Sequence, residues 1–462
     1  MAIIILICIF IVLVVITVKP KLGIVLLWPM LFLYPHYLMF KSQALPLNIG
    51  IDDLFICLIF LIVLVRRNLF GGIPIKFGFA FWVTFAFFII LLVSNLYSYS
   101  LVGVEFEIFI KAILKGIITI LLAYSLVNSI DDQKDLKRVI FAFCFSAGLG
   151  AIIMIFQQFF PGPFSIFASP YYVYGLEYGA NPAPAGAFMN QNNAAVILAM
   201  ASLIILCTLK IKSIYFRKDF RFIFLGIMVI AILFTRSRSG FLCLVIPLMM
   251  MGFMGQNKGY TIGFMVLGLI IFIALPAFRS ALFERFTGSE TETYNVGFFE
   301  PIMMRLSVVA KMWKNITLGR LLLGQSNVVD RMRELGTAHN AYFGIPLNYG
   351  IGGTVWIISI VSILLHKANI MKKQPDIVIS SVGFLIRWCL LIFALYSVVG
   401  TFLGNFYIRY SLFLLTALAQ CGVELSQQYQ SCEYEQYYIE DTDLFSSGKE
   451  YLNSNFSEYD FY

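Results

Sequence analysis

The chain has 462 residues and a formal net charge of +8, with 60% hydrophobic residues, only 13% charged residues and a mean hydropathy of +0.86. No water-soluble domain of this length has such a composition. Apolar runs of about 20 residues recur from Ile3 to Cys421, and each is long enough to cross a hydrocarbon core of roughly 30 Å as a helix. Their length and lack of alternation exclude membrane β-strands. We therefore predict an all-α, polytopic membrane protein.

Apolar segments that could span the membrane follow one another with short breaks. The first lacks a preceding basic region and a small-residue cleavage site, so we expect a retained helix and not a removable signal peptide. Only Lys19, Pro20 and Lys21 separate the first two segments, so we expect 12 or 13 spans. In chain order the segments are 3–18, 22–40, 51–65, 77–97, 108–128, 139–160, 188–209, 222–235, 240–255, 260–277, 341–365, 378–400 and 402–422.

Loops rich in lysine and arginine alternate along the chain with loops that have few basic residues. The positive-inside rule assigns the basic loops to the cytoplasm. The loop 161–187, the break at 236–239 and the long loop 278–340 then face outward, which is the periplasmic side of a bacterial inner membrane. The predicted cytoplasmic residues are Lys19, Lys21, Arg66, Arg67, Lys76, Lys134, Lys137, Arg138, Lys210, Lys212, Arg217, Lys218, Arg221, Lys258, Lys367, Lys372 and Lys373.

Two parts of the chain differ in charge. The segment 423–462 holds nine acidic residues and one lysine, so residues 1–422 carry +16, that is +8 minus −8. We predict that residues 1–422 form one transmembrane domain. The acidic, tyrosine-rich tail at 423–462 is predicted to be disordered and cytoplasmic.

Two arginines stand between the apolar segments 222–235 and 240–255, where Arg236 and Arg238 have almost no loop around them. A charge in hydrocarbon is costly, so this position favours arginines that face an aqueous cavity or an anionic partner. Two arginines that extend to the membrane interface explain the pattern equally well.

The predicted outer loop 278–340 carries eight basic residues. One is Arg305, within a stretch from Glu300 to Lys314 whose apolar residues have helical spacing. Guanidinium groups bind phosphoryl oxygens in a bidentate manner, so the loop suits a phosphate-bearing ligand. Attraction to lipid headgroups and a solvated helix face are the simpler alternatives.

His339 is one of only three histidines, and it ends the long polar loop where the chain returns to hydrophobic sequence. An imidazole there would reach both water and a lipid-borne substrate, and it is the side chain best suited to move a proton near neutral pH. The alternative is an interfacial histidine that anchors a helix end. If residues 341–365 are helical, Gly350 and Gly353 share one helix face and let a neighbouring helix approach closely.

The histidine segment resembles a signature of the O-antigen ligase and polymerase superfamily, the Wzy–WaaL group of membrane glycosyltransferases. The signature is histidine, then asparagine or serine, nine residues, glycine, two residues and a second glycine. His339, Asn340, Gly350 and Gly353 match it.

Three further segments resemble the same family. Ser237–Gly240 is similar to the family's break between two spans, which favours Arg238 over Arg236. Gly186–Asn193 is similar to the entry of a middle span, and Arg305 matches a loop arginine. The resemblance covers about residues 186–400, whereas the first 160 residues match only in hydropathy.

The resemblance implies a GT-C-like helical fold. It implies transfer of a glycan from an undecaprenyl-diphosphate carrier to a hydroxyl acceptor at the outer face of the inner membrane, with no metal or other cofactor. Arg238 and Arg305 would meet the charge of the leaving diphosphate, with Arg236 in support. His339 would act as the base toward the acceptor hydroxyl, and Asn340 would orient the imidazole or bind sugar.

The acceptor stays open at this point. A lipid A-core sugar would make the protein a ligase, and a second carrier-linked glycan would make it a polymerase. Membrane lipid and other polysaccharide-assembly proteins are the further expected partners, and nucleic acid is not one.

Other functions compete with this interpretation. Glu105 and Glu107, at a predicted outer loop, resemble the carboxylates of metal-dependent membrane glycosyltransferases, although the helix dipole also favours acids at a helix start. A transporter or flippase of lipid-linked sugars would favour paired intramembrane charges and repeated halves. Arg387 and Arg409 are the basic residues well inside the last spans. A non-catalytic member of an assembly complex is the third class.

Overall fold

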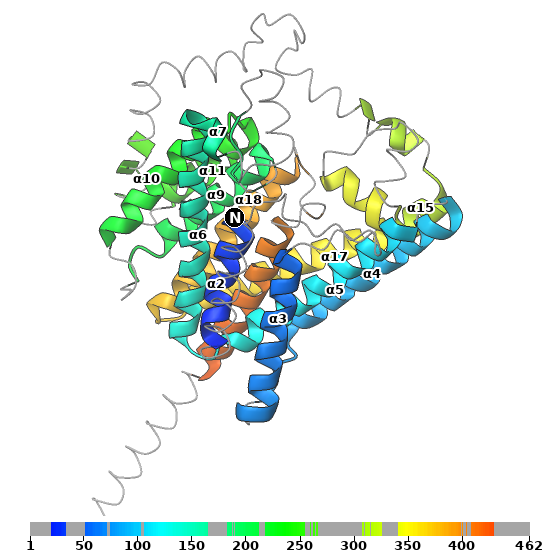
Figure 1. Cartoon of the computed structure of the whole chain (residues 1–462), viewed down its shortest axis with the longest axis horizontal. Helices are drawn as coiled ribbons and strands as arrows, with labels where there is room; N and C mark the ends of the chain where they lie inside the picture. The colour runs from blue at the N-terminus through cyan, green and yellow to red at the C-terminus, as the bar shows by residue number, and fades with distance from the viewer. Residues whose placement is uncertain are drawn as a thin grey trace, which may run out of the picture.

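The computed structural model of the chain describes most of the predicted membrane domain, and within the described residues every regular element is a helix (Figure 1). The described residues are 20–33, 51–71, 74–102, 106–164, 183–186, 188, 190–211, 218–254, 259, 262–263, 265–266, 307–308, 310–314, 316–325, 341–398, 400, 403 and 408–428.

The helices follow the predicted apolar segments. In chain order they are α2 (Pro20–Leu33), α3 (Ile51–Val65), η2 (Arg66–Gly71), α4 (Phe79–Val102), α5 (Phe106–Ser129), α6 (Gln133–Phe159), α7 (Pro161–Phe164), α9 (Gln191–Cys207), α10 (Lys218–Phe234), α11 (Arg238–Phe253), α15 (Leu318–Leu323), α17 (Ala341–Lys372) and α18 (Ile377–Ser397). A further helix covers Ile408–Gln428 and is called the 408–428 helix below.

Five of the described helices are long and apolar enough to cross a membrane, and α9 and α11 are shorter apolar helices. The prediction of an all-α, multi-pass membrane protein is therefore confirmed for the described part of the chain. The five helices are Phe79–Leu101, Gln133–Phe159, Ala341–Lys372, Ile377–Ser397 and Ile408–Gln428. The predicted spans 3–18 and 260–277 lie wholly or mostly outside the described residues.

α9 is the buried centre of one group of helices. Every side chain from Asn193 to Cys207 is buried, and α6, α10, α11 and α18 pack around this helix (Figure 1). Small residues allow close contact: a methyl group added to Gly240 of α11 would lie 2.0 Å from Ala195 Cβ. α9 and α11 therefore approach each other almost backbone to backbone, as small residues permit between membrane helices.

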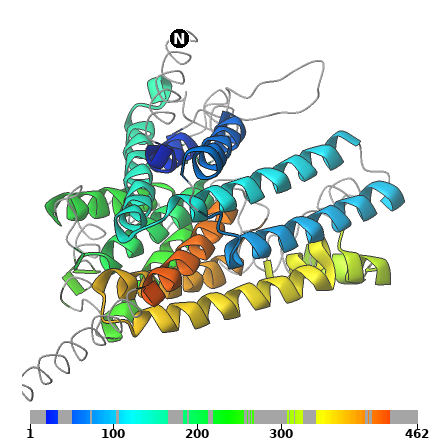
Figure 2. The same cartoon turned by 90° about the horizontal axis from the view of Figure 1, so that it is seen from below.

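A second group contains α4, α5 and α17, which lie side by side and extend to one edge of the molecule (Figures 1 and 2). Trp356 of α17 donates a hydrogen bond from Nε1 to the Val83 carbonyl oxygen of α4 over 2.9 Å. The 408–428 helix packs against this group, since the Phe413 ring lies 6.0 Å from the Phe87 ring, centroid to centroid.

Charged residues from several predicted cytoplasmic loops meet at one end of the bundle, called the basic end below. Arg67 pairs with Asp131, and Lys21 pairs with Asp135. Lys76 lies 3.8 Å from Asp131 and 3.6 Å from Glu424, at the end of the 408–428 helix. The loops that the sequence assigns to one side of the membrane therefore lie together, and the 408–428 helix ends among them.

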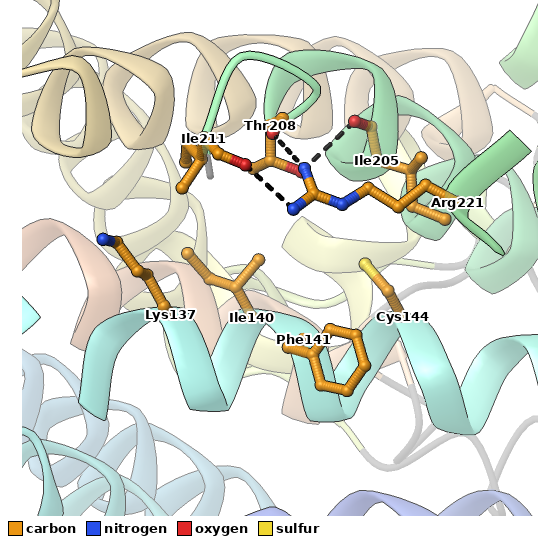
Figure 3. Close-up of a pocket in the computed structure, with 8 residues that line it drawn as sticks. All are labelled: Lys137, Ile140, Phe141, Cys144, Ile205, Thr208, Ile211 and Arg221. Carbon is orange, nitrogen blue, oxygen red and sulfur yellow. Dashed lines mark hydrogen bonds between the residues drawn. The ribbon is translucent and has the colours of Figure 1, made fainter. Parts of the chain in front are cut away.

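The helix directions place the arginine break at the opposite end. Arg221, near the start of α10, donates hydrogen bonds to the carbonyl oxygens of Thr208 (2.6 Å) and Ile211 (2.8 Å), just beyond the end of α9 (Figure 3). Lys137, close to Asp135 in the first turns of α6, lines the same small pocket (Figure 3). α9 thus ends and α10 begins at the basic end, and α10 leads away from it.

Candidate functional site

The break between α10 and α11 is a tight turn held by its own side chains. Thr235 Oγ1 donates to the Ile232 carbonyl oxygen (2.6 Å) and accepts from the Ser237 amide (3.2 Å). Ser237 caps α11 by accepting a hydrogen bond from the Gly240 amide over 3.1 Å. Between them Arg236 has a φ of 52°, which is unusual for a residue other than glycine. The turn therefore fixes the backbone of both arginines.

The start of α9 lies against this turn. Ser237 Oγ donates a hydrogen bond to Asn192 Oδ1 over 2.7 Å. Asn190 caps α9, because its side chain accepts from the Asn192 amide over 2.7 Å. The segments 186–193 and 235–240, far apart in the sequence, are thus in direct contact.

Two tyrosines extend the contact to α18 and α17. Tyr396, the second-last residue of α18, donates to Asn193 Oδ1 over 2.8 Å, and this bond is buried. Tyr342, in the first turn of α17, donates to the carbonyl oxygen of Ala394 over 2.9 Å. Since Ala394 and Tyr396 are two residues apart, one series of contacts joins the arginine break to the beginning of α17.

The electrostatics of this end of the bundle suit an anion. α9, α11 and α17 all begin here, and the N-terminus of a helix carries partial positive charge and free amide groups. Arg236 and Arg238 add two cations and are only partly buried. Burial lowers the pKa of the Arg238 guanidinium below its usual value, because desolvation disfavours the charged form.

Three predicted site residues lie outside the described residues, namely His339, Asn340 and Arg305. The described chain resumes at Ala341, which is buried, directly after Asn340. Of the predicted diphosphate ligands, the structure thus describes Arg236 and Arg238.

The prediction that Gly350 and Gly353 share one helix face is wrong, whereas the predicted close approach of a neighbouring helix is found at Gly350. α17 is broken at Gly350, whose φ of 64° and ψ of −164° are not helical, so Gly350 and Gly353 do not share one continuous helix face. A Cβ on Gly350 would lie 2.3 Å from the Leu322 carbonyl oxygen, so the neighbour that approaches closely is the end of α15. A Cβ on Gly353 would meet its own helix at Tyr349 Cβ, 2.2 Å away.

Gly324, which ends α15, is the partner of Gly350. Its φ is 79°, and a Cβ there would lie 2.5 Å from the Asn348 carbonyl oxygen. The Gln325 amide donates to the Leu347 carbonyl oxygen over 3.0 Å. Two glycines without side chains therefore let the end of α15 lie backbone to backbone against the break in α17.

The competing carboxylate pair is only partly described. Glu107 forms an ion pair with Lys111, one turn later in α5, and Glu105 lies outside the described residues. Among the described residues, no three His, Cys, Asp or Glu side chains are grouped closely enough to hold a metal ion.

No protein-family model matches the chain, and no curated protein matches it.

Proposed function

We propose that this protein is a membrane glycosyltransferase of the O-antigen ligase or polymerase type. It transfers a glycan from an undecaprenyl-diphosphate carrier to a hydroxyl group of the acceptor. The observation that carries the proposal is the hydrogen bond from Ser237 to Asn192, which joins two segments that resemble the family separately. The contacts from Asn193 through α18 to Tyr342 extend this site to the first turn of α17, the helix that begins directly after His339 and Asn340.

The chemistry divides between two kinds of group. The leaving diphosphate gains negative charge as the glycosidic bond breaks, and fixed cations lower that barrier. Arg238 takes this role, supported by Arg236, by Arg305 from the loop and by the helix N-termini at this end. His339 removes the proton of the attacking hydroxyl, and Asn340 orients the imidazole. No step in this scheme requires a nucleotide sugar or a metal.

The proposal includes a GT-C-like fold of 12 or 13 spans in the bacterial inner membrane. The basic end, with Arg67 and Lys76, faces the cytoplasm, and the arginine break faces the periplasm. This orientation is supported by the gathering of basic loops at one end and of the break at the other. Residues 423–428, predicted as the start of a disordered tail, instead complete the 408–428 helix, and the acidic segment after them then starts on the cytoplasmic side.

Transport of a lipid-linked sugar is the second candidate, because α17 is interrupted at Gly350. Broken membrane helices line substrate sites in many transporters. An assay of the purified protein in detergent distinguishes the two functions, because transport cannot be observed without two compartments. A transferase forms a new glycosidic bond between the carrier-linked glycan and its acceptor, whereas a transporter leaves both unchanged.

Deletion of the gene, followed by electrophoresis of the surface polysaccharide, tests the proposal in the cell. Loss of all attached chains indicates a ligase whose acceptor is a lipid A-core sugar. Chains that carry a single repeat indicate a polymerase whose acceptor is a second carrier-linked glycan. Surface polysaccharide of unchanged length and amount would contradict both, and would leave transport or a supporting role in an assembly complex.

A further inference from the structure

Arg387 lies at the middle of a membrane-spanning helix. α18 runs from Ile377 to Ser397, so ten of its residues precede Arg387 and ten follow it. At 1.5 Å per residue, Arg387 is about 15 Å from each end of the helix. The start of α18 is held at the basic end, because Gln133 Nε2 donates to Asp376 Oδ2 over 2.9 Å. Even an extended side chain therefore leaves this guanidinium within the hydrocarbon core.

The groove that Arg387 lines is otherwise apolar. It has a volume of about 300 Å³ and lies between α11, α17 and α18. Met250, Met254 and Leu365 form part of its walls and are 41%, 51% and 38% exposed, so the groove is open at the surface of the described bundle. At this depth such a surface meets lipid tails or another membrane helix. Methionine side chains adapt to the shape of a partner, which suits a surface for a second helix.

The charge of Arg387 is not compensated within the described part of the chain, where it has neither an ion pair nor a hydrogen bond. A charged arginine at the centre of a membrane is costly, and such residues pair with an anion or face water. Phospholipid phosphates lie at the membrane surface, about 15 Å away from the centre of the hydrocarbon core. The partner that fits the groove is therefore a carboxylate held at the same depth.

Carboxylates are almost absent from the spans of this chain. Among the 13 predicted spans, only 51–65 contains acidic residues, which are Asp52 and Asp53. Asp53 is 2% exposed, and Lys115 Nζ donates to its Oδ1 over 2.6 Å. Asp52 belongs to the first turn of the same helix, α3, which packs mainly on α2 and α5. A second copy of the chain would have the same shortage, so the carboxylate that fits Arg387 belongs to another protein.

We propose that the groove at Arg387 binds a transmembrane helix of another membrane protein, and that this helix carries an aspartate or glutamate near its middle. The ion pair would fix the depth and rotation of the partner helix, because every other alignment leaves both charges in hydrocarbon. The apolar walls would pack against the side chains on either side of the carboxylate. This interaction does not rest on the proposed function, since a transferase and a transporter could both use it.

The test uses synthetic transmembrane peptides of leucine and alanine that differ at one central position, which is glutamate or glutamine. The purified full-length protein is placed in vesicles of zwitterionic phospholipid, and binding is measured by energy transfer between dyes on protein and peptide. A low peptide-to-lipid ratio prevents pairing of the peptides. We expect the glutamate peptide to bind at least tenfold more tightly than the glutamine peptide. Equal binding of the two peptides by the wild-type protein would overturn the proposal.

Variants of the protein assign the preference to Arg387. Arg387→Gln should remove the preference for glutamate, Arg387→Lys should retain part of it, and Arg387→Glu should instead prefer a peptide with a central lysine. Lys367→Gln is the matched control, because this cation of α17 lies over the Phe79 ring, 5.4 Å from its centroid, at the start of α4. An unchanged preference in Arg387→Gln would overturn the proposal.

Folding of each variant is checked by its melting temperature and elution volume without peptide. If Arg387→Gln does not fold, Arg387→Lys decides, and a folded lysine variant without any preference for glutamate overturns the proposal. Two other occupants have their own signatures. Arg387-dependent dimers of the protein alone would mean that a second copy fills the groove. Arg387-dependent retention of phosphatidylglycerol during purification, with no preference between the peptides, would mean a lipid. Either result would show the proposal to be wrong.

The natural partner is sought with a photo-crosslinking amino acid in place of Leu391, which lines the groove. We expect it to capture, in the cell, a membrane protein whose crosslinked helix contains an aspartate or glutamate. Conversion of that residue to asparagine or glutamine should reduce crosslinking as much as Arg387→Gln does. A captured helix without an acidic residue, or crosslinking that is insensitive to Arg387→Gln, would contradict the proposal.

Discussion

Ser237 and Asn192 are joined by a hydrogen bond of 2.7 Å across 45 residues of sequence. The same serine hydroxyl accepts from the Gly240 amide, so one oxygen both caps α11 and ties it to the start of α9. This relationship determines where Arg238, the first residue of α11, can lie. Changes to either partner should therefore alter the site without altering its charge.

Substitution of Ser237 by alanine removes the cap of α11 and the bond to Asn192. Loss of a serine cap costs about 1 kcal/mol, so we expect a lower melting temperature and weaker glycan transfer. Ser239→Ala is the control, because the Ser239 hydroxyl lies 3.1 Å from Ser237 Oγ but does not cap the helix. Equal melting temperatures and transfer rates for the two variants would contradict this role of Ser237.

Gly240→Ala should separate α9 from α11. The added methyl group would lie 2.0 Å from Ala195 Cβ, far inside contact distance, and overpacking of this kind typically costs about 1–3 kcal/mol. Gly226→Ala in α10 has nothing within 4 Å of the new methyl group, so it should be neutral or stabilising. Thermal unfolding of both purified variants checks the pair, and a Gly240→Ala protein as stable as Gly226→Ala would count against the close packing.

Much of the fold could be predicted because hydrocarbon thickness fixes the length of a spanning helix. Predicted segments such as 51–65 and 108–128 coincide with or lie within two residues of α3 and α5. The prediction of helix ends is less accurate where the helix begins among polar residues. α6 begins at Gln133, six residues before the predicted 139, because Asp132 caps it and the charged first turn packs in the ion-pair cluster of the basic end.

The candidate site was predicted in part. The arginine break and Asn192 carry sequence signals, since charged and amide side chains stand out between apolar segments. Tyr396 carries none, because a tyrosine in an apolar span cannot be told from a packing residue until its hydroxyl partner is known. The break at Gly350 was missed for a related reason. A glycine within an apolar run fits close helix packing as well as a positive φ.

The bond from Tyr396 to Asn193 is buried and links α18 to the start of α9. We expect Tyr396→Phe to lose about 1 kcal/mol of stability, since a neutral hydrogen bond contributes about that much. A double-mutant cycle with Asn193→Ala isolates the contact. The two single effects should not add, because either substitution removes the same bond. Strictly additive losses would show that the two side chains act independently.

Gly350→Ala should destabilise the protein strongly. A side chain at its φ and ψ is strained by roughly 1–3 kcal/mol, and its Cβ would also lie 2.3 Å from a carbonyl oxygen of α15. Gly352→Ala, two residues later, meets only Ile90 Cγ1 at an ordinary 3.8 Å and should have little effect. The melting temperatures of the two variants provide the comparison. Tolerance of alanine at 350 would mean that α17 is continuous there.

The central claim is that cations at the α10–α11 break stabilise the leaving diphosphate. Its most direct test is the rate of glycan transfer by purified protein from an undecaprenyl-diphosphate-linked donor, compared among the wild type, Arg238→Gln, His339→Ala and the control Lys210→Gln, whose exposed side chain lies at the basic end. We predict a loss on the order of 100- to 1,000-fold for Arg238→Gln, a loss of similar size for His339→Ala and none for Lys210→Gln. Wild-type transfer rates in folded Arg238→Gln protein would contradict the claim.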